Sequence, residues 1–374
     1  MAISPMDESL AHQTSETFDR VATSDRNFYD RYYFNLHPMS GDLFLVFGMG
    51  QYPNLGTTDA FVCLVHEGKQ HVLRCSRELG DNRADTTVGP FGVQVLEGLK
   101  TIRIVCDPNE HGIEFDLTFD GTSPAVEEPR TIMRKGARIT MDTSRYTQLG
   151  RWQGSIKIHG REIAVNNEEY LGVRDHSWGV RPVGESEPMG IRINEYMEEY
   201  GFFHMWTPMQ FDDFAIKVFI EENSDGSLIV QECIKVDSFA RGGAVHELGE
   251  ARHNITYKPG TRELQSAQLE FEDENGKALT VQCEALTCAY LAAGTGYYPN
   301  EEWVHGQYHG KFKLEYRDFD VSTDEARSTL GPLYETIVRF ELSSGEVTYG
   351  MFENLSIGHH SPYGFDSFEA VAPE

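Results

Sequence analysis

Residues 160–179 read GREIAVNNEEYLGVRDHSWG, and residues 345–364 read GEVTYGMFENLSIGHHSPYG. The two segments align without gaps at an offset of 185 residues: a glycine, a glutamate eight positions later and a second glycine eleven positions after that recur in both. An aromatic residue precedes the last glycine in each, Trp178 in the first segment and Tyr363 in the second. This echo predicts two similar modules of about 185 residues each.

Both modules are expected to consist of β-strands joined by tight turns. The chain contains 35 Gly, 22 Phe and 17 Tyr among 374 residues, and Asp-Gly or Asn-Gly pairs separate several strand-like runs. Residues 214–220 and 303–316 each alternate in character, which predicts half-buried strands because successive side chains point to opposite faces. Helical periodicity is scarce, and the best candidate is a short helix near 323–335 that begins at Thr323 as its cap.

These features predict an all-β fold of two antiparallel β-barrels packed side by side, with few short helices. Closing an antiparallel sheet into a barrel removes its exposed edges and lets its mouth hold one ligand. The expected divisions are a mobile tail over 1–28, an N-terminal barrel over 29–188 and a C-terminal barrel over 189–374.

The net charge of the chain argues against some classes of binding partner. The 32 Lys and Arg against 59 Asp and Glu give a net charge of −27, which disfavours nucleic acid and anionic membrane surfaces. The sequence holds no run of about 18 apolar residues, so no integral membrane segment is expected, and residues 1–20 lack the apolar centre of a signal peptide. We therefore expect a cytoplasmic protein. Its six cysteines form no C-x-x-C pair and are expected to be free core thiols.

The densest group of chemically active side chains lies in 170–181, which reads YLGVRDHSWGVR. In an extended chain Arg174, His176 and Trp178 share one face, and Asp175 lies on the other. Two interpretations remain open. The cluster is a buried structural knot that joins the barrels, since buried charges must be paired, or it is a site with an acid, an aromatic wall and a positioning cation.

The string RDHSWG over 174–179 resembles the D-H-x-W-G signature of the carotenoid 1,2-hydratase (hydroxyneurosporene synthase) group, whose relatives include tocopherol cyclase, fungal lipocalin-like Diels–Alderases and AttH-like proteins. The match falls at Asp175, His176, Trp178 and the glycine that follows, and weaker likeness extends over most of 29–365. The resemblance implies two lipocalin-like β-barrels around an apolar ligand cavity. It also implies cofactor-free acid chemistry on terpenoid alkenes or pericyclic ring closure, although some members resemble lipid carriers.

Asp175 is the residue on which this chemistry depends. Hydration or cyclisation of an electron-rich alkene needs a proton delivered to carbon, and a carboxyl group can supply it if an apolar cavity keeps it neutral. His176 would orient Asp175 or activate water. A cation beside Asp175 would lower its pKa, so the prediction requires Arg174 to point to the opposite face.

Aromatic faces are expected to wall the cavity and to stabilise a developing cation, and an arginine would anchor a polar group of the substrate. Core packing alone would also explain the aromatic residues. The candidates for substrate binding are Arg174, Arg181, Tyr170, Trp178, Tyr196, His204 and Trp206.

No metal or cofactor is expected. The sequence lacks a G-x-S-x-G elbow and a phosphate loop, and Gly48-Met-Gly50 lacks the third glycine of a dinucleotide fingerprint. His305 and His309 have an H-x-x-x-H spacing, but on a strand they would lie roughly 13 Å apart, too far to chelate one ion.

Three functional hypotheses remain. The first is a cofactor-independent lyase or isomerase, meaning a hydratase or dehydratase, isomerase or cyclase, that acts on an alkene of an isoprenoid or other apolar small molecule. The second is a non-enzymatic carrier of lipid or terpenoid ligands. The third is a structural module whose barrels are packed solid, without the cavity that a ligand needs.

Overall fold

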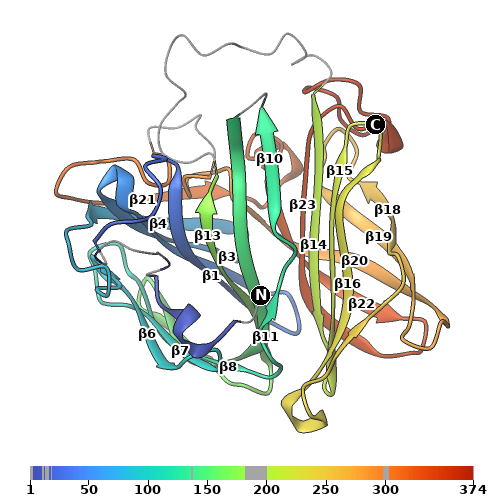
Figure 1. Ribbon diagram of the computed structural model, residues 1–374, viewed down its shortest axis with the longest axis horizontal. Helices are drawn as coiled ribbons and strands as arrows, with labels where there is room; N and C mark the ends of the chain where they lie inside the picture. Colours follow the sequence, from blue (N-terminus) through green and yellow to red (C-terminus); the bar gives the residue numbers. More distant parts are fainter. Residues whose placement is uncertain are drawn as a thin grey trace.

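The computed structural model describes residues 3–10, 12, 17, 19–135, 138–181, 200–297 and 303–373. Within these residues the chain forms two curled antiparallel β-sheets that lie side by side (Figure 1). The helical segments of the described chain are short. They are η1 (Pro5–Glu8), η2 (Pro53–Leu55), η4 (Phe239–Arg241), α1 (Asp324–Arg327) and η5 (Ser361–Tyr363). The all-β, two-barrel fold predicted from the sequence is confirmed.

The first sheet follows the order β21-β4-β3-β2-β1-β13-β11-β8-β7-β6-β5, and β9, β10 and β12 each pair with β11. Its strands are β1 (Phe28–Pro38), β2 (Leu43–Tyr52), β3 (Thr57–His66), β4 (Lys69–Glu78), β5 (Thr87–Val88), β6 (Phe91–Glu97), β7 (Thr101–Cys106), β8 (Ile113–Gly121), β9 (Val126–Glu127), β10 (Thr131–Lys135), β11 (Arg138–Ile158), β12 (Arg161–Val165), β13 (Tyr170–Val180) and β21 (Phe312–Asp320).

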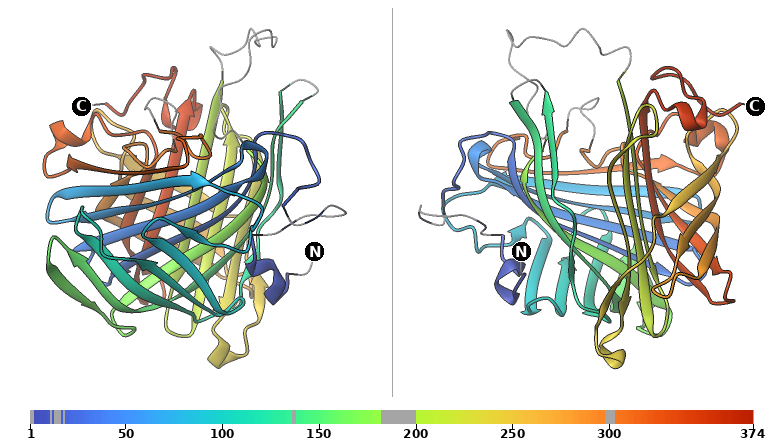
Figure 2. Two further views of the ribbon diagram at one scale, coloured as in Figure 1. Left: turned by 90° about the vertical axis from the view of Figure 1, so that its left-hand side faces the viewer. Right: turned by 45° about the vertical axis from the view of Figure 1, so that its right-hand side comes forward.

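The second sheet follows the order β17-β16-β15-β14-β23-β22-β20-β19-β18. Where the two sheets face each other, their strands run in clearly different directions (Figure 2). The strands of the second sheet are β14 (Gly201–Gln210), β15 (Phe214–Asn223), β16 (Leu228–Asp237), β17 (Val245–Glu247), β18 (Arg252–Tyr257), β19 (Leu264–Glu272), β20 (Ala278–Tyr290), β22 (Tyr334–Leu342) and β23 (Val347–Gly358).

The two echoing segments of the sequence occupy equivalent places in the two sheets. The first ends in β13, which pairs with β1, the first strand of its sheet. The second contains β23, which pairs with β14, the first strand of the other sheet. In both modules, therefore, the repeated segment brings a late strand of the module back onto its first strand.

One strand crosses between the modules. β21 belongs to the C-terminal half of the sequence, yet it pairs antiparallel with β4 and forms an edge of the first sheet. The division of the chain at 188/189 predicted from the sequence lies outside the described residues, and β21 shows that the two halves do not fold from wholly separate stretches of chain.

Three large apolar cores stabilise this arrangement, and strands such as β2 and β15, which lie between two cores, are buried on both faces. The first core lies within the curl of the first sheet and includes Phe34, Phe47, Phe115 and Trp152. The third lies within the second sheet and includes Met205, Ile216, Val218 and Phe340. The middle core, which we call the inter-sheet layer, joins side chains of both sheets, among them Tyr33, Val46, Phe61, Val173, Trp206, Phe219 and Ile337.

β15 shows how the sequence encodes a two-sided strand. Ile216 and Val218 enter the third core, whereas Ala215 and Phe219 enter the inter-sheet layer. The alternation over 214–220 predicts a strand that is buried on one face, and the structure buries both. As a consequence Lys217, which shares a face with Ala215 and Phe219, is enclosed between the sheets and is only 2% exposed.

The predicted strand over 303–316 is wrong in its first half. The strand begins at Phe312, and the residues before it form a loop held by side-chain packing. The Trp303 ring stacks on His309 at 4.2 Å between centroids and lies 4.8 Å from the Arg74 guanidinium. The helix near 323–335 is also shorter than predicted, although Thr323 Oγ1 caps it by accepting a hydrogen bond from the Ala326 N–H.

The start of the chain differs from the mobile tail predicted over 1–28. Within the described residues, η1 packs on the first module, and Leu10 belongs to the first core. Glu8 is buried, and its backbone carbonyl accepts a hydrogen bond from the Tyr32 hydroxyl. The polar sequence is ordered here because its charges find buried partners that lie far along the chain.

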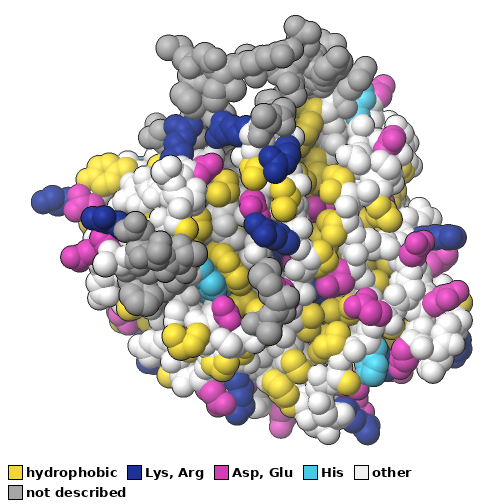
Figure 3. Space-filling model, in the orientation of Figure 1, with side chains coloured by type: hydrophobic (Ala, Val, Ile, Leu, Met, Phe, Trp, Pro, Cys, Tyr) yellow, Lys and Arg dark blue, Asp and Glu magenta, His cyan; other side chains and the backbone are white. Residues whose placement is uncertain are grey.

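Other expectations concern cysteines and the surface. All six cysteines are buried free thiols, as predicted. Acidic side chains are spread over the face shown in Figure 3 rather than gathered in one patch. In the part of the chain that the structure describes, no helix combines the length and the apolar character needed to cross a membrane.

Candidate active site between the two sheets

β13 divides the chemically dense segment 170–181 between two faces. Arg174 and His176 lie on the side of the first core, with the start of the chain. Asp175 lies on the other side, among charged groups of the inter-sheet layer. The alternation predicted from the sequence is therefore correct, and it separates residues that were expected to act together.

Arg174 is paired on the side away from Asp175. Its Nη1 and Nη2 donate to Glu8 Oε1 and Oε2 at 2.6 and 2.8 Å, and Gln148 Oε1 accepts from its Nε at 3.0 Å. This pairing satisfies the condition that Arg174 must not neutralise Asp175. It also means that the predicted role of Arg174 as a substrate anchor does not fit, because its guanidinium is buried and already bonded.

His176 and Trp178 also face away from Asp175. His176 Nε2 lies 2.7 Å from Asp30 Oδ1, and its Nδ1 lies 3.0 Å from the Tyr146 hydroxyl. The ring of Trp178 stacks on His12 with 3.7 Å between centroids. The prediction that His176 orients Asp175 is therefore wrong, since adjacent residues of a strand project to opposite faces.

Of the other two predicted substrate contacts, one lies outside the inter-sheet layer and one cannot be placed because it is not among the described residues. The side chain of Tyr170 belongs to the first core, so packing explains it. Tyr196 lies outside the described residues.

Asp175 occupies a setting that favours its neutral form. Burial raises the pKa of Asp175 to about 6, in spite of the opposing charge of Arg145. Arg145 Nε is 3.9 Å from Asp175 Oδ1, too long for a hydrogen bond. From the residues that the structure describes, the Asp175 carboxyl accepts no hydrogen bond, and its side chain remains 11% exposed. Asp175 is thus a carboxyl group with one long ion pair and a pKa of about 6, which is close to neutral pH.

Arg145, which forms a long ion pair with Asp175, also contacts a second carboxylate. Arg145 Nη1 lies 3.3 Å from Glu128 Oε2, and Glu128 Oε1 lies 3.3 Å from the Lys217 ammonium of the second sheet. Lys217 in turn contacts Glu232. Burial acts to raise the pKa of Glu128, but Lys217 and Arg145 outweigh it and lower that pKa to about 2. This chain of charges links the sheets, and Arg145 is shared between Glu128 and Asp175.

His204 and Trp206 lie in the inter-sheet layer, as the predicted site requires. His204 Nδ1 is 3.3 Å from Glu221 Oε1, and its Nε2 is 3.7 Å from Glu353 Oε1. Burial acts to lower the pKa of His204, but these carboxylates outweigh it and raise that pKa. The Trp206 ring meets Tyr33 edge to face at 5.9 Å, and its buried indole N–H has no hydrogen-bond partner among the described residues.

Arg181 lies at the end of β13 on the side of Asp175. Its guanidinium sits over the Tyr29 ring at 4.4 Å and near Tyr297 at 5.8 Å. Its charge also acts to lower the pKa of Asp175. The position of Arg181 is compatible with the predicted role as an anchor for the substrate, and that role stays a prediction.

A second buried acid, Glu335, was not predicted from the sequence. It projects from β22, and its Oε2 accepts a hydrogen bond of 2.6 Å from the Tyr33 hydroxyl of the first sheet. Burial raises the pKa of Glu335 well above its ordinary value, and the charges of Glu353 and Asp175 act in the same direction. Glu353 is the glutamate of the echo in the sequence, which is the one signal that could have drawn attention to this group.

Replacing Glu335 with glutamine tests whether this acid is neutral. Glu335→Gln should be at least as stable as the wild type at pH 8, because glutamine keeps an acceptor for Tyr33 and carries no charge. Above about pH 4.5 the unfolded chain gains from ionisation that the folded chain resists, so the advantage of the variant should grow with pH. Urea unfolding at pH 4, 6 and 8 measures it.

The matched control is Glu341→Gln, at an exposed pair with Arg339. It should show no gain that grows with pH. A Glu335→Gln protein less stable than the wild type at pH 8 would contradict the neutral form.

Two curled antiparallel sheets, each with a late strand paired to its first and packed together through the inter-sheet layer, form a double-lipocalin type of fold. The chain belongs to a family of unknown function, DUF8625, whose model matches residues 3–366. No curated protein matches the chain.

Solved structures share the fold at low identity. A Nitrosomonas europaea protein described as an AttH has 15% identity and a TM-score of 0.51, with 89% of this chain and 93% of that chain covered. Kievitone hydratase from Nectria haematococca has 11% identity and a TM-score of 0.47, with 93% and 96% covered. CghA with Sch210972 has 9% identity and a TM-score of 0.48, with 90% and 89% covered. The AttH likeness confirms the predicted double-lipocalin fold and says nothing of the chemistry.

Proposed function

We propose that this chain is a cofactor-independent lyase or isomerase that protonates an alkene of an isoprenoid or other apolar small molecule between the two sheets. The observation that carries the proposal is the setting of Asp175, a buried carboxyl with a pKa of about 6 that accepts no hydrogen bond from the described residues. A carboxyl group in that state can act as a general acid near neutral pH.

The proposed reaction begins with transfer of the Asp175 proton to an alkene carbon. The cation that forms is stabilised by the faces of Trp206 and Tyr33. In a hydratase, water then adds to the cation and loses a proton. In a cyclase, a second double bond of the same molecule closes on the cation, and the new cation on the ring loses a neighbouring proton or adds water, which then loses one. In an isomerase, a neighbouring proton leaves directly. In each case the proton that is released returns to the Asp175 carboxylate, which restores the acid.

Two groups are suited to hold the substrate. The unpartnered indole N–H of Trp206 can donate a hydrogen bond to a substrate oxygen. Arg181 offers a cation at the end of β13, on the side of Asp175. His204 is better suited to positioning than to accepting a proton, because Glu221 and Glu353 favour its charged form.

Deuterium incorporation tests the proposal for any product, because each of the three outcomes leaves solvent hydrogen on carbon. The protein is incubated in D2O with short isoprenoid alkenes, geraniol and farnesol, and the recovered compounds are analysed by mass spectrometry. Carbon-bound deuterium, with or without added water, is the expected result. Tight binding with recovery of unlabelled compounds would instead show a carrier, and neither binding nor exchange with these probes would contradict the proposed substrate class.

The pH dependence of the reaction follows from the acid form of Asp175. Its pKa of about 6 means that the proton donor is lost as the pH rises through that value. We expect kcat/KM to fall about tenfold per pH unit above pH 6 and to level off below it. Deuterium-exchange rates between pH 5 and 8 measure this profile, and a rate that rises with pH would contradict an acid role.

A further inference from the structure

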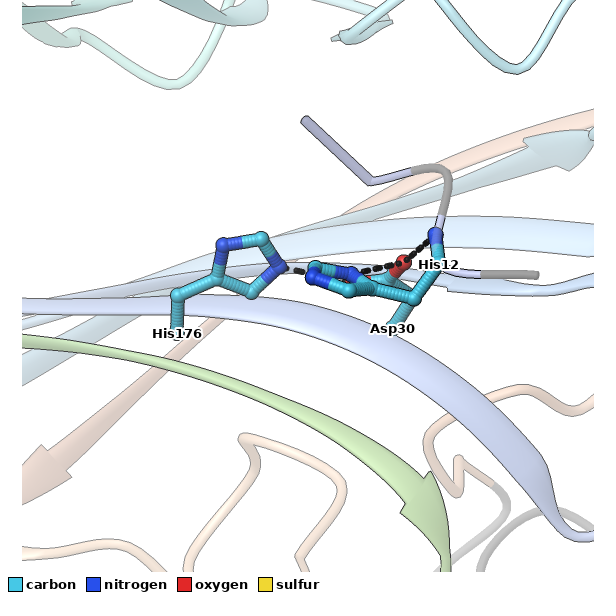
Figure 4. Close-up of side chains that lie close together, drawn as sticks. All are labelled: His12, Asp30 and His176. Carbon is cyan, nitrogen blue, oxygen red and sulfur yellow. Dashed lines mark hydrogen bonds and ion pairs between the residues drawn. The ribbon is translucent and has the colours of Figure 1, made fainter. Parts of the chain in front are cut away.

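A group of metal-ligating side chains lies on the face of β13 opposite Asp175. His12, Asp30 and His176 each offer a ligand atom, and these atoms lie within 4.8 Å of one another (Figure 4). They come from the start of the chain, from β1 and from β13. His12 Nδ1 is 3.3 Å from Asp30 Oδ2, and His176 Nε2 is 2.7 Å from Asp30 Oδ1. Neighbouring ligands of a tetrahedral zinc ion are about 3.3 Å apart, so little movement is needed.

In both histidines, the ring nitrogen that faces away from Asp30 contacts another side chain. His12 Nε2 lies 3.3 Å from Asp7 Oδ1, and His176 Nδ1 lies 3.0 Å from the Tyr146 hydroxyl. The Tyr146 hydroxyl donates its proton to the Glu8 carboxylate at 2.8 Å, so it must accept from His176 Nδ1. Nε2 is the nitrogen of His176 that faces Asp30, at 2.7 Å from Oδ1, so it is the one placed to ligate an ion shared with Asp30. Such outer contacts fix the tautomer and orientation of metal-ligating histidines.

The charges around the group leave room for a cation. Among the described residues, Asp7, Glu8 and Asp30 contribute three carboxylates and Arg83 and Arg174 two guanidinium groups, so the carboxylates exceed the arginines by one (3 − 2 = 1) before the imidazoles are counted. Arg83 Nη2 lies 3.6 Å from Asp30 Oδ2, on the oxygen that also faces His12. Both Asp30 and His176 have fully buried side chains, where an uncompensated charge is costly.

We propose that His12, Asp30 and His176 bind a divalent cation of the zinc type, which fastens the start of the chain to β1 and β13. Two imidazole nitrogens and one carboxylate oxygen suit Zn²⁺ better than Mg²⁺ or Ca²⁺, which prefer oxygen ligands. The sequence suggested no metal site because His12 is distant from the 170–181 segment and has no ligand spacing with it. The proposal does not depend on the chemistry proposed for Asp175, which lies on the other face of the strand.

Zinc titration of the chelator-treated protein tests the site. Zn²⁺ is added in competition with a chromophoric chelator, and the fluorescence of Trp178 is followed because its ring stacks on His12. We expect one tight equivalent in the wild type, and a loss of affinity of about 100-fold or more in His12→Ala. His12 is partly exposed, so this variant should keep its fold, and Asp30→Asn should weaken binding as well.

The matched control is His246→Ala. His246 is a partly exposed histidine whose Nε2 lies 3.1 Å from one carboxylate, that of Asp237. It should bind zinc as tightly as the wild type. No tight equivalent in the wild type, or equal affinities in the wild type and His12→Ala, would overturn the proposal.

Discussion

Asp175→Asn is expected to lower turnover by about 100-fold or more, because an amide cannot deliver a proton to carbon. Asparagine keeps the shape of the side chain, and no hydrogen bond from the described residues depends on the carboxylate. The deuterium-exchange assay measures the loss with the probe that the wild type turns over best. Unchanged exchange in a folded variant would remove Asp175 from the mechanism.

Stability separates loss of the acid from loss of the fold. The pKa of Asp175 is raised from 3.8 to about 6, so ionising it in the folded state costs about 3 kcal/mol of stability above pH 6 and nothing below pH 3.8. Asp175→Asn should recover part of this at pH 8 and differ little from the wild type at pH 4. Asp116→Asn, on the exposed surface, serves as the control, and it should show no such gain.

Glu8→Ala is expected to destabilise the protein by about 3–5 kcal/mol, because it leaves the buried Arg174 guanidinium without its carboxylate. Both side chains are at most 1% exposed, so water cannot replace the lost partner. Urea unfolding measures the change. The same variant should loosen the start of the chain, which limited proteolysis followed by mass spectrometry can detect.

The control for Glu8 is an exposed pair of the same chemistry. Arg103 Nε and Nη2 donate to Asp116 Oδ1 and Oδ2, each at 2.7 Å, but the two side chains are 35% and 57% exposed. Asp116→Ala should cost less than about 1 kcal/mol. Similar small losses in both variants would show that the start of the chain does not depend on Arg174.

Local patterns predicted the parts of the fold that depend on local order. The alternation over 214–220 identified β15, and the echo at 160–179 and 345–364 predicted two similar modules, whose repeated segments the structure places on the first strand of each sheet. The two-residue period of a strand, applied to residues 170–181, placed Asp175 on the face opposite Arg174. These inferences hold because the period of a strand is fixed by its backbone.

Contacts between distant segments could not be predicted in this way. Glu8 meets Arg174 at a separation of 166 residues, and Tyr33 meets Glu335 at 302. Neither pair leaves a spacing in the sequence. The pairing of β21 with β4 in the first sheet is likewise a contact between distant segments. Only part of the candidate site was therefore predicted. Four predicted residues lie on the inter-sheet side, namely Asp175, Arg181, His204 and Trp206. Glu335 and the pairing of Arg145 with both Glu128 and Asp175 emerge only from the fold.

The protonation state of Asp175 can be measured directly by infrared difference spectroscopy. Subtracting the spectrum of Asp175→Asn from that of the wild type isolates the carboxyl stretch of this one side chain during a pH titration. The account predicts a protonated band that disappears with a midpoint near pH 6. A midpoint at or below pH 4, with the carboxylate present throughout the neutral range, would contradict the proposed acid.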